Sequence, residues 1–258
     1  MKLAFSEYKP LHDKYVYPYA IWAFPEEGEK PADLYAKGFL PSAKDLSRYY
    51  MTRSVRVDLK QFKISSENKR ILKKIEHVDF KLIKRKDFDF DKKWKKFCLD
   101  YAENRWGERV MPPGRLKELF EKEITSDVLV FTDQESKKDI GLITVFNDEN
   151  KIAHYYYAFY DLSYFNNNLG MFMMTQTVKL LAENGFDYLY LGTCYSRNSM
   201  YKTQFSGVEF WNGFKWTQNM KELKYLISRD QQEDIDIHLL ESGYIEQFYE
   251  KGISDIIS

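Results

Sequence analysis

Residues 127–192 read DVLVFTDQESKKDIGLITVFNDENKIAHYYYAFYDLSYFNNNLGMFMMTQTVKLLAENGFDYLYLG, and this stretch decides the fold. It begins with three runs rich in β-branched and aromatic residues, at 127–131, 141–146 and 152–160. Short polar segments separate the runs, as they do between neighbouring strands of an antiparallel sheet. The stretch therefore predicts a meander of three antiparallel strands.

A helix and a further strand follow these runs. Apolar residues recur at helical spacing from Leu169 onward, and Gly185 is placed to end the helix. The segment FDYLYLG, residues 186–192, then predicts another buried strand. Three antiparallel strands, a helix and a parallel strand form the core of the N-acetyltransferase superfamily. The expected fold class is α+β, a GNAT-like mixed sheet flanked by helices, in which the acyl donor lies where two central strands part.

Three regions are expected along the chain. Residues 1–76 predict a small N-terminal subdomain, residues 77–220 the acyltransferase core, and residues 221–258 an acidic helical tail. In the first region, ADLYAKGF predicts a helix that ends at Gly38, and SVRVDLKQF, residues 54–62, alternates apolar and charged residues. That alternation predicts a half-buried strand with one charged face.

The charge of the chain is balanced as a whole and uneven along its length. Its 258 residues include 39 Lys and Arg against 39 Asp and Glu. Between Lys69 and Lys96 there are twelve basic and five acidic residues, whereas Asp230 to Ser258 holds eight acids and one lysine. The basic run is either a solvated helix face or a surface that contacts phosphates.

Composition excludes several classes of protein. The two cysteines, Cys98 and Cys194, are far apart and form no CxxC motif, so neither a disulfide framework nor a cysteine zinc site is expected. The first residues lack the apolar core of a signal peptide, and nowhere do about 18 apolar residues run together. We expect a cytoplasmic protein with no membrane partner, and the sequence makes no prediction of its oligomeric state.

Short motifs along the chain carry a resemblance through their order and spacing, although each of them alone is weak. They are KGF (37–39), SVRV (54–57) followed by NKRIL (68–72), MPPGR (111–115), YYYAFYD (155–161), LG (169–170), LYLG (189–192) and MYKTQF (200–205). Over roughly residues 10–210 the chain thus resembles the aminoacyl-tRNA protein transferases. That family comprises the eukaryotic arginyltransferases and the bacterial leucyltransferases for N-terminal Asp and Glu.

The resemblance implies a reaction. The α-amino group of a protein or peptide with an acidic N-terminus would attack the ester carbonyl of an aminoacyl-tRNA of the arginyl or leucyl class, and the ribose hydroxyl would leave. Because the ester is already activated, holding the two reactants in contact supplies much of the catalysis, and no enzyme nucleophile is needed. The implied partners are aminoacyl-tRNA and the acceptor chain.

Two departures from the family pattern stand out. The family usually carries a cysteine cluster, able to bind a metal or an iron–sulfur cluster, before the strand at residue 54; here that stretch reads LSRYYMTRS, without cysteine. The family pattern P-S-R-S-Q-R-R reads ISSENKR here, residues 64–70, so its first arginine is missing. We therefore expect no metal and no cofactor, and the missing arginine puts acceptor specificity in doubt.

The expected donor site lies at the end of the third strand. Strand alternation places Tyr155, Tyr157, Phe159 and Asp161 on one face and His154, Tyr156, Ala158 and Tyr160 on the other. The resemblance favours Tyr157, Phe159 and Asp161. The rings would stack the terminal adenine or are simply core, and Asp161 would receive the amine proton or merely cap the strand end. His154 falls on no family motif and is expected to be a structural or surface histidine.

Further candidates are cations and their neighbours. MYKTQF and the residues before it place Lys202, Arg197 and Tyr201 beside the donor, and Lys202 would neutralise a tRNA phosphate or an acidic side chain of the acceptor. Arg56 and Arg70 would bind the same kinds of anion, since a guanidinium suits both. For each of these cations the alternative is an ordinary surface residue.

Two rival functions remain open. An acetyl-CoA-dependent N-acetyltransferase needs a glycine-rich turn before the central helix to cradle a pyrophosphate, and here NNNLGMFMM offers only Gly170, which we otherwise place among the substrate-binding residues. A non-catalytic tRNA- or peptide-binding relative would keep the fold without turnover.

Overall fold

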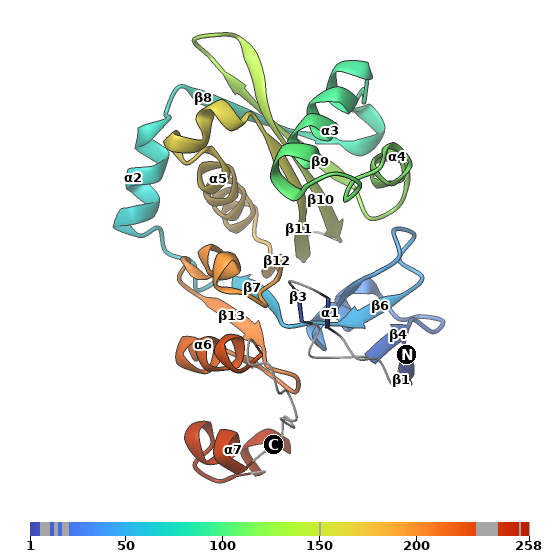
Figure 1. The fold of residues 1–258 in the computed structure, drawn as a ribbon, viewed down its shortest axis with the longest axis vertical. Coiled ribbons are helices and arrows are strands. Elements are labelled where there is room, and N and C mark those ends of the chain that lie inside the picture. Colours follow the sequence, from blue (N-terminus) through green and yellow to red (C-terminus); the bar gives the residue numbers. More distant parts are fainter. Residues whose placement is uncertain are drawn as a thin grey trace. The chain divides into compact units, whose positions relative to one another are not determined.

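The computed structural model describes residues 1–5, 11–12, 15–16, 21–149, 151–230, 242–252 and 254–257 (Figure 1). The chain forms two compact units. Unit 1 comprises Met1–Ala43, Ser47–Arg56 and Gly192–Ser258, and unit 2 comprises Lys44–Leu46 and Val57–Leu191. The three regions expected from motifs and composition, 1–76, 77–220 and 221–258, stay a prediction.

Unit 2 contains the sheet that the sequence predicts. Its elements are α2 (Ser66–Lys74), β8 (Val78–Lys84), η1 (Arg85–Asp87), α3 (Lys92–Trp106), α4 (Pro113–Glu121), β9 (Asp127–Asp133), β10 (Lys138–Asp148), β11 (Ile152–Tyr160), η2 (Leu162–Asn167), α5 (Leu169–Glu183) and the first part of β12 (Tyr188–Thr193). The strands lie in the order β12-β11-β10-β9-β8. β12 is parallel to β11 and the other neighbours are antiparallel. The α+β class, a GNAT-like mixed sheet flanked by helices, is confirmed.

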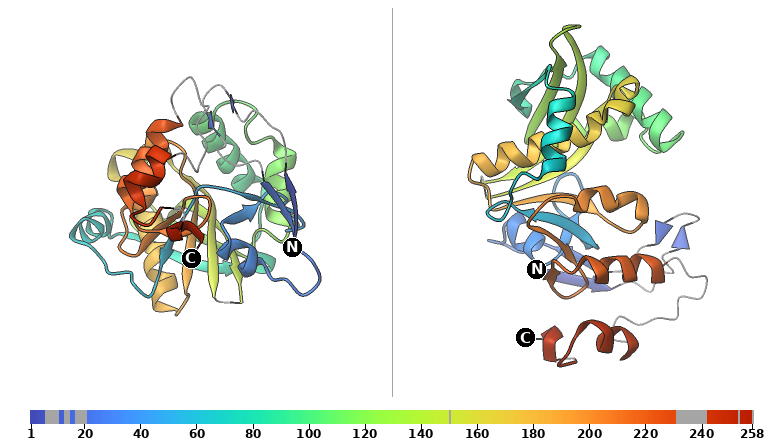
Figure 2. Two further views of the ribbon diagram at one scale, coloured as in Figure 1. Left: turned by 90° about the horizontal axis from the view of Figure 1, so that it is seen from below. Right: turned by 90° about the vertical axis from the view of Figure 1, so that its left-hand side faces the viewer.

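Helices cover both faces of this sheet (Figure 2). α3 lies on the face that carries Phe159, because the ring of Tyr101 is 5.8 Å from the Phe159 ring. α5 lies on the opposite face, close to β10. A Cβ atom added at Gly141 of β10 would be 2.7 Å from the Met173 sulfur, so α5 packs closely on this glycine. Gly185, at φ +76°, ends α5 as predicted.

A β-bulge interrupts the regular pairing of β10 with β11. Thr144 is opposite Tyr157 and Val145 is opposite Tyr155, so Tyr156 is the extra residue. The hydroxyl of Thr144 accepts the Tyr157 N–H at 3.1 Å. Because opposed residues share a face, the bulge puts Tyr155 and Tyr157 on opposite faces. The prediction that these two side chains share a face with each other was wrong, since simple alternation does not foresee an inserted residue.

Unit 1 consists of small sheets and terminal helices. Its elements are β1 (Lys2–Phe5), β2 (Leu11–His12), β3 (Tyr15–Val16), β4 (Ile21–Phe24), α1 (Pro31–Ala36), β5 (Phe39–Pro41), β6 (Tyr49–Met51), most of β7 (Ser54–Asp58), η3 (Arg197–Thr203), β13 (Val208–Trp211), β14 (Trp216–Thr217), α6 (Met220–Arg229), α7 (Ser242–Phe248) and α8 (Ser254–Ile257). Four strands form an antiparallel sheet in the order β1-β4-β6-β5. The KGF motif has a packing role here, because Gly38 ends the turn after α1 at φ +80° with the Trp211 ring directly against it.

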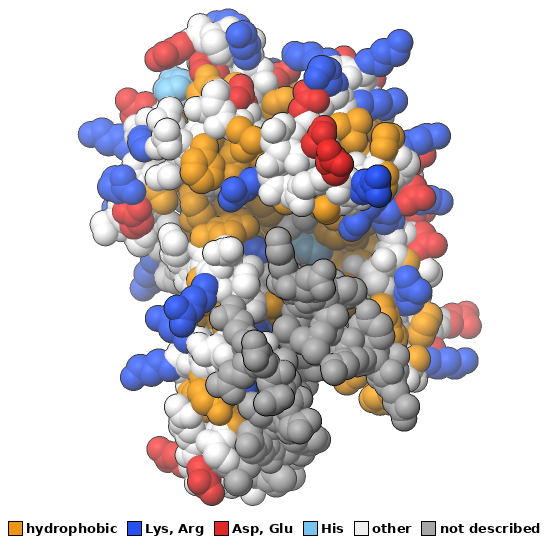
Figure 3. Space-filling view, in the orientation of Figure 1, with side chains coloured by type: hydrophobic (Ala, Val, Ile, Leu, Met, Phe, Trp, Pro, Cys, Tyr) orange, Lys and Arg blue, Asp and Glu red, His pale blue; other side chains and the backbone are white. Residues whose placement is uncertain are grey.

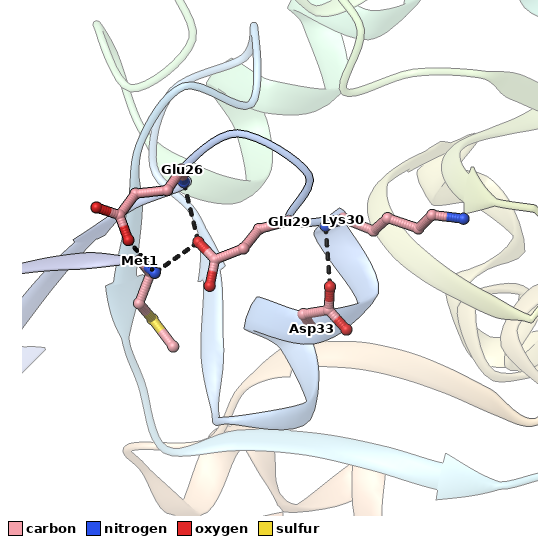
Figure 4. A network of polar contacts seen from close by, with 5 residues as sticks. All are labelled: Met1, Glu26, Glu29, Lys30 and Asp33. Carbon is pink, nitrogen blue, oxygen red and sulfur yellow. Dashed lines mark hydrogen bonds and ion pairs between the residues drawn. The ribbon is translucent and has the colours of Figure 1, made fainter.

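The start of unit 1 is held by carboxylates (Figure 4). The ammonium group of Met1 lies 3.0 Å from Glu26 and 2.7 Å from Glu29, and these contacts raise its pKa. Asp33 accepts the backbone N–H of Lys30 at 2.9 Å and so satisfies a free donor at the start of α1. The Glu26–Glu29 turn and the first strand are thereby tied together.

Strand β7 differs from its predicted character. Residues Ser54 to Val57 are all buried, so the strand does not have one exposed charged face. The guanidinium of Arg56 lies 2.8 Å from Glu209 and 4.0 Å from the centre of the Trp216 ring. These two partners from β13 and β14 cover the face that the alternation assigned to solvent, so that prediction was wrong.

A buried carboxyl group attaches α7 to α6. Glu222 is 2% exposed and accepts hydrogen bonds from Asn212 at 2.9 Å and from the hydroxyls of Tyr244 and Tyr249, each at 2.6 Å. The pKa values of Tyr244 and Tyr249 are raised, mainly by burial and next by the hydrogen bond to Glu222. Two helices were expected in the acidic tail; α7 and α8 lie there, and residues 231–241 lie outside the described residues.

Replacing Tyr249 by Phe should loosen α7. A hydrogen bond to a buried carboxyl group is lost, which costs about 1.5–3 kcal/mol if the group is ionised. We expect the amide protons of α7 to exchange at least tenfold faster, measured by hydrogen–deuterium exchange of the full chain. Tyr225→Phe is the matched control, because the Tyr225 ring stacks on Tyr244 and its hydroxyl joins none of the hydrogen bonds of the described residues. Equal protection in the two variants would contradict this role of Glu222.

Candidate functional site

The candidate site lies in unit 2, where β11 continues beyond its pairing with β12. The parallel register joins Ile152, Ala153 and His154 to Tyr188, Leu189 and Tyr190. β11 then runs on to Tyr160 without a further pair to β12 in the described part of unit 2. The bulge at Tyr156 falls just after the last pair. Two central strands thus part at the place where the fold class puts the acyl donor.

Four aromatic side chains cluster where β11 runs beyond its last pair with β12, two from β11 and two from α3. Trp106 lies 5.6 Å from both Tyr157 and Phe159, Tyr101 lies 5.4 Å from Trp106, and the Tyr157 and Phe159 rings stack at 5.9 Å. We call these four residues the aromatic wall. Trp106 and Tyr157 are half-buried, while Phe159 is fully buried. Of the two rings predicted to stack a base, only Tyr157 reaches the surface, and Phe159 supports it from below.

Arg115 borders the aromatic wall. It lies in the first turn of α4, and its guanidinium donates to the Tyr157 hydroxyl at 3.1 Å and to the Val110 carbonyl at 3.2 Å. The side chain is exposed. The MPPGR motif pointed to this segment, but the sequence analysis gave Arg115 no role, because the contact with Tyr157 joins residues 42 positions apart.

Asp161 occupies the turn that follows β11. Its Oδ1 accepts the backbone N–H of Ser163 at 2.9 Å and the Ser163 hydroxyl at 2.7 Å, which caps η2. Its Oδ2 joins none of the hydrogen bonds formed by the described residues. One oxygen therefore has a structural partner, as the capping alternative expects, and the other remains available to a proton or an amino group.

Gly170 lies in the first turn of α5, against the wall's neighbour Tyr160. A Cβ atom at Gly170 would be 3.1 Å from the Tyr160 ring, whose centre is 4.9 Å from that of Tyr101. The glycine is thus explained by close packing on an aromatic ring. This packing gives no support to a phosphate cradle of the acetyl-CoA type.

Gly170→Ala should separate packing from function. Alanine favours the helix by about 0.8–1 kcal/mol, whereas Tyr160 must shift by a few tenths of an ångström to accommodate the methyl group. We expect stability within about 1 kcal/mol of the wild type, and a several-fold lower rate of the aminoacyl transfer that the sequence resemblance implies. Gly243→Ala in α7 is the control, since its Cβ would meet no atom within 4 Å. Unchanged transfer by Gly170→Ala would show that the position of Tyr160 does not matter.

Lys202 lies in η3 of unit 1. Its Nζ donates to the Thr193 carbonyl at 2.8 Å, and the side chain is only partly exposed. Burial lowers the pKa of Lys202 to about 8. The neighbouring thiol of Cys194 is itself buried, and burial raises its pKa. Lys202 is therefore not an ordinary surface lysine, because its charge is costly in the free protein.

The other predicted cations differ in their surroundings. Arg56 is buried in unit 1 with Glu209. Arg70 is exposed in unit 2, where Glu67 binds it through both carboxylate oxygens at 2.7 and 2.6 Å. Arg197, the first residue of η3, is exposed, and Tyr201 within η3 is 42% exposed. The predicted site residues are divided between the two units. Unit 1 contains Arg56, Arg197, Tyr201 and Lys202. Unit 2 contains Arg70, Tyr157, Phe159, Asp161 and Gly170.

Acidic neighbours accompany the basic run of unit 2. Four of its cations form ion pairs with carboxylates: Arg70, Lys84, Lys93 and Lys96. On the face seen in Figure 3, Lys and Arg side chains are interspersed with Asp and Glu side chains. Exposed ion pairs of this kind contribute little stability, and they weaken the local positive potential. These pairs favour the solvated-face alternative for part of the run.

Three further features concern metal ligands, membrane helices and cysteines. Within the described ranges, no group of three or more His, Cys, Asp or Glu side chains could hold a metal ion. None of the described helices is long and apolar enough to cross a membrane. Cys98 is buried, which raises the pKa of its thiol as it does for Cys194, so neither cysteine offers a thiolate near neutral pH.

The strand order of unit 2 and the parting of its central strands are those of a GNAT-like mixed sheet. Residues 85–212 match the model of the C terminus of arginine-tRNA-protein transferases. This segment is therefore similar to that family, in agreement with the resemblance found in the motifs. The match begins at residue 85, so the KGF and NKRIL motifs lie before it.

Two relatives carry the name aspartate/glutamate leucyltransferase. The protein from Ruegeria sp. (strain TM1040) is 26% identical over 187 residues, which cover 69% of this chain and 65% of the relative. The protein from Ruegeria pomeroyi is 26% identical over 171 residues, covering 63% and 60%. The chain thus spans less than two thirds of the length of either relative.

Among solved structures, similarity is seen to the C-terminal domain of a putative lysylphosphatidylglycerol synthetase from Agrobacterium fabrum. Its TM-score is 0.44 at 14% identity, over 55% of this chain and 46% of that one.

Proposed function

We propose that this protein transfers an amino acid from aminoacyl-tRNA to the α-amino group of a protein or peptide with an acidic N-terminus, and that it acts in the cytoplasm. The observation that carries the proposal is the family match over residues 85–212, which includes the aromatic wall and the parted strands. Both named relatives are leucyltransferases. We therefore take leucine as the donor.

Catalysis would rest on proximity. The amine attacks the ester carbonyl, the C–N bond forms, the C–O bond to the ribose breaks, and the ribose oxygen takes up a proton. Holding the two reactants in line is worth up to about 7–11 kcal/mol in model systems. Asp161, through its free Oδ2, would take the proton released by the amine. Lys202, as an ammonium ion, would neutralise a phosphate of the tRNA or the acidic side chain of the acceptor.

Two observations bear on the acetyl-CoA alternative. Gly170 packs closely on Tyr160, which accounts for a small residue at this position without a phosphate. The residue before α5, Asn168, has φ +61°, and its side chain accepts no capping hydrogen bond. The turn therefore offers one glycine that is already used for packing, and the acetyl-CoA alternative gains no support from it.

The test is incubation of the purified full chain with leucyl-tRNA, arginyl-tRNA or acetyl-CoA and a peptide that begins with aspartate. Mass spectrometry of the peptide should show the addition of one leucyl residue. A peptide with an acetylated N-terminus is the control and should stay unchanged. An acetylated product from acetyl-CoA, with no aminoacyl product, would replace the proposal by its rival, and tRNA binding without any product would favour the non-catalytic alternative.

A further inference from the structure

Arg115 follows a turn segment that leads into α4. Gly107 and Arg109 have φ values of +97° and +67°, and Pro113 occupies the first turn of the helix. Proline fixes the backbone there before the helix begins, and Met111 anchors the segment because it is only 6% exposed. The guanidinium is thus presented from the start of α4, where proline sets the backbone and Met111 is buried.

The surroundings of Arg115 leave its charge available. Its two hydrogen bonds go to neutral oxygens, the Tyr157 hydroxyl and the Val110 carbonyl. Within the described residues, Arg115 joins none of the ion pairs, in contrast to Arg70, which Glu67 neutralises. The remaining N–H groups of an exposed guanidinium can bind an anion through two parallel hydrogen bonds.

The Arg115 guanidinium and the half-buried rings beside it could together bind a nucleoside monophosphate, which has both an anionic group and a flat base. The outer rings of the wall, Trp106 and Tyr157, are half-buried, so they can stack a base, as rings do in proteins that bind single-stranded nucleic acid. The guanidinium is fixed to the hydroxyl of one of these rings at 3.1 Å, which places phosphate-binding and base-stacking groups side by side. The carboxylate of an acidic acceptor could bind Arg115, but the acceptor would provide no base to stack on Trp106 and Tyr157.

We propose that Arg115 binds the phosphate of the terminal adenosine of tRNA while the adenine stacks on Tyr157 and Trp106. This inference rests on the proposed function, because it takes the 3′ end of tRNA as the occupant. Arg115 would then be a binding and positioning residue. It would fix the register of the tRNA end at β11 and take no part in proton transfer.

The test uses adenosine 5′-monophosphate and adenosine as probes, titrated into the full chain at low ionic strength and followed by NMR. In the wild type the monophosphate should bind at least about tenfold more tightly than the nucleoside, as a charge-assisted bidentate contact predicts. In Arg115→Met this preference should disappear, while binding of adenosine itself stays within about twofold. Lys117→Met, on the same helix, is the matched control and should keep the preference, because Lys117 lies next to Glu121.

The outcomes separate this inference from the proposed function. Equal affinities in the wild type, or a preference that survives in Arg115→Met, would overturn the phosphate contact even if leucyl transfer occurs. An Arg115-dependent affinity for an aspartyl dipeptide in place of the monophosphate would overturn it too, and would assign the cation to the acceptor. An Arg115-dependent preference for the monophosphate in a protein that transfers no amino acid would leave the nucleotide site standing and remove the proposed function.

Discussion

The Lys202→Met variant should fold normally and lose at least about 100-fold in kcat/KM for leucyl transfer, the size of effect seen when one preorganised electrostatic group is removed. The ammonium group is partly buried beside the Thr193 carbonyl, and burial lowers its pKa to about 8. A charge that is costly in the free protein becomes favourable when an anion arrives. Methionine has a similar shape and cannot supply that charge.

The protonation of Lys202 also predicts the direction in which kcat/KM changes with pH. Lys202 is protonated below its pKa of about 8 and neutral above it. If the ammonium form binds an anion, kcat/KM should fall as the pH rises through about 8, and this step should be absent from the residual activity of Lys202→Met. Lys224→Met in α6 is the control, because Lys224 is exposed and should leave both rate and profile unchanged. A rate that rises through the same pH would instead assign Lys202 as a base.

The pKa of Lys202 also predicts a trend in stability. The unfolded pKa of lysine is near 10.4, above the folded value of about 8. Between these two values the unfolded chain binds more protons than the folded chain, so Lys202 makes the free energy of unfolding rise with pH in this window. Urea unfolding at several pH values should show a smaller rise for Lys202→Met than for the wild type.

Tyr157→Ala should have the second large effect. Removing the outer ring of the aromatic wall deletes a stacking surface worth about 1–3 kcal/mol per base. We expect KM for charged tRNA to increase about 10- to 100-fold, with a smaller change in kcat, measured by steady-state transfer to an aspartyl peptide. Tyr157→Phe keeps the ring and should lie close to the wild type apart from the contribution of its bond to Arg115. A normal KM in Tyr157→Ala would show that the wall is only core packing.

The order of elements in unit 2 could be predicted from the sequence because apolar periodicity reports burial directly. The runs at 127–131, 141–146 and 152–160 are strands, and Gly185 ends the helix between β11 and β12. Strand β8 was not predicted, although Val78, Phe80 and Leu82 alternate with polar residues, because its many charged residues obscure the apolar alternation. As the edge strand, β8 carries charged side chains that discourage pairing with another chain.

The failures of prediction share a physical cause. The bulge at Tyr156 and the burial of Arg56 each depend on a partner far away in the sequence, Thr144 in the first case and Glu209 in the second. Local alternation contains no information about either partner. For the same reason Arg115 was overlooked and the lowered pKa of Lys202 was not foreseen, because both follow from tertiary contacts and burial.

The most direct test of the central claim is a competition for the site at the parted strands. Leucyl-tRNA should bind the full chain at low salt, and it should bind more tightly than the same tRNA after its amino acid has been removed by hydrolysis. Coenzyme A at a large excess should leave this binding unchanged. Absence of affinity for charged tRNA, or its displacement by coenzyme A, would contradict the account.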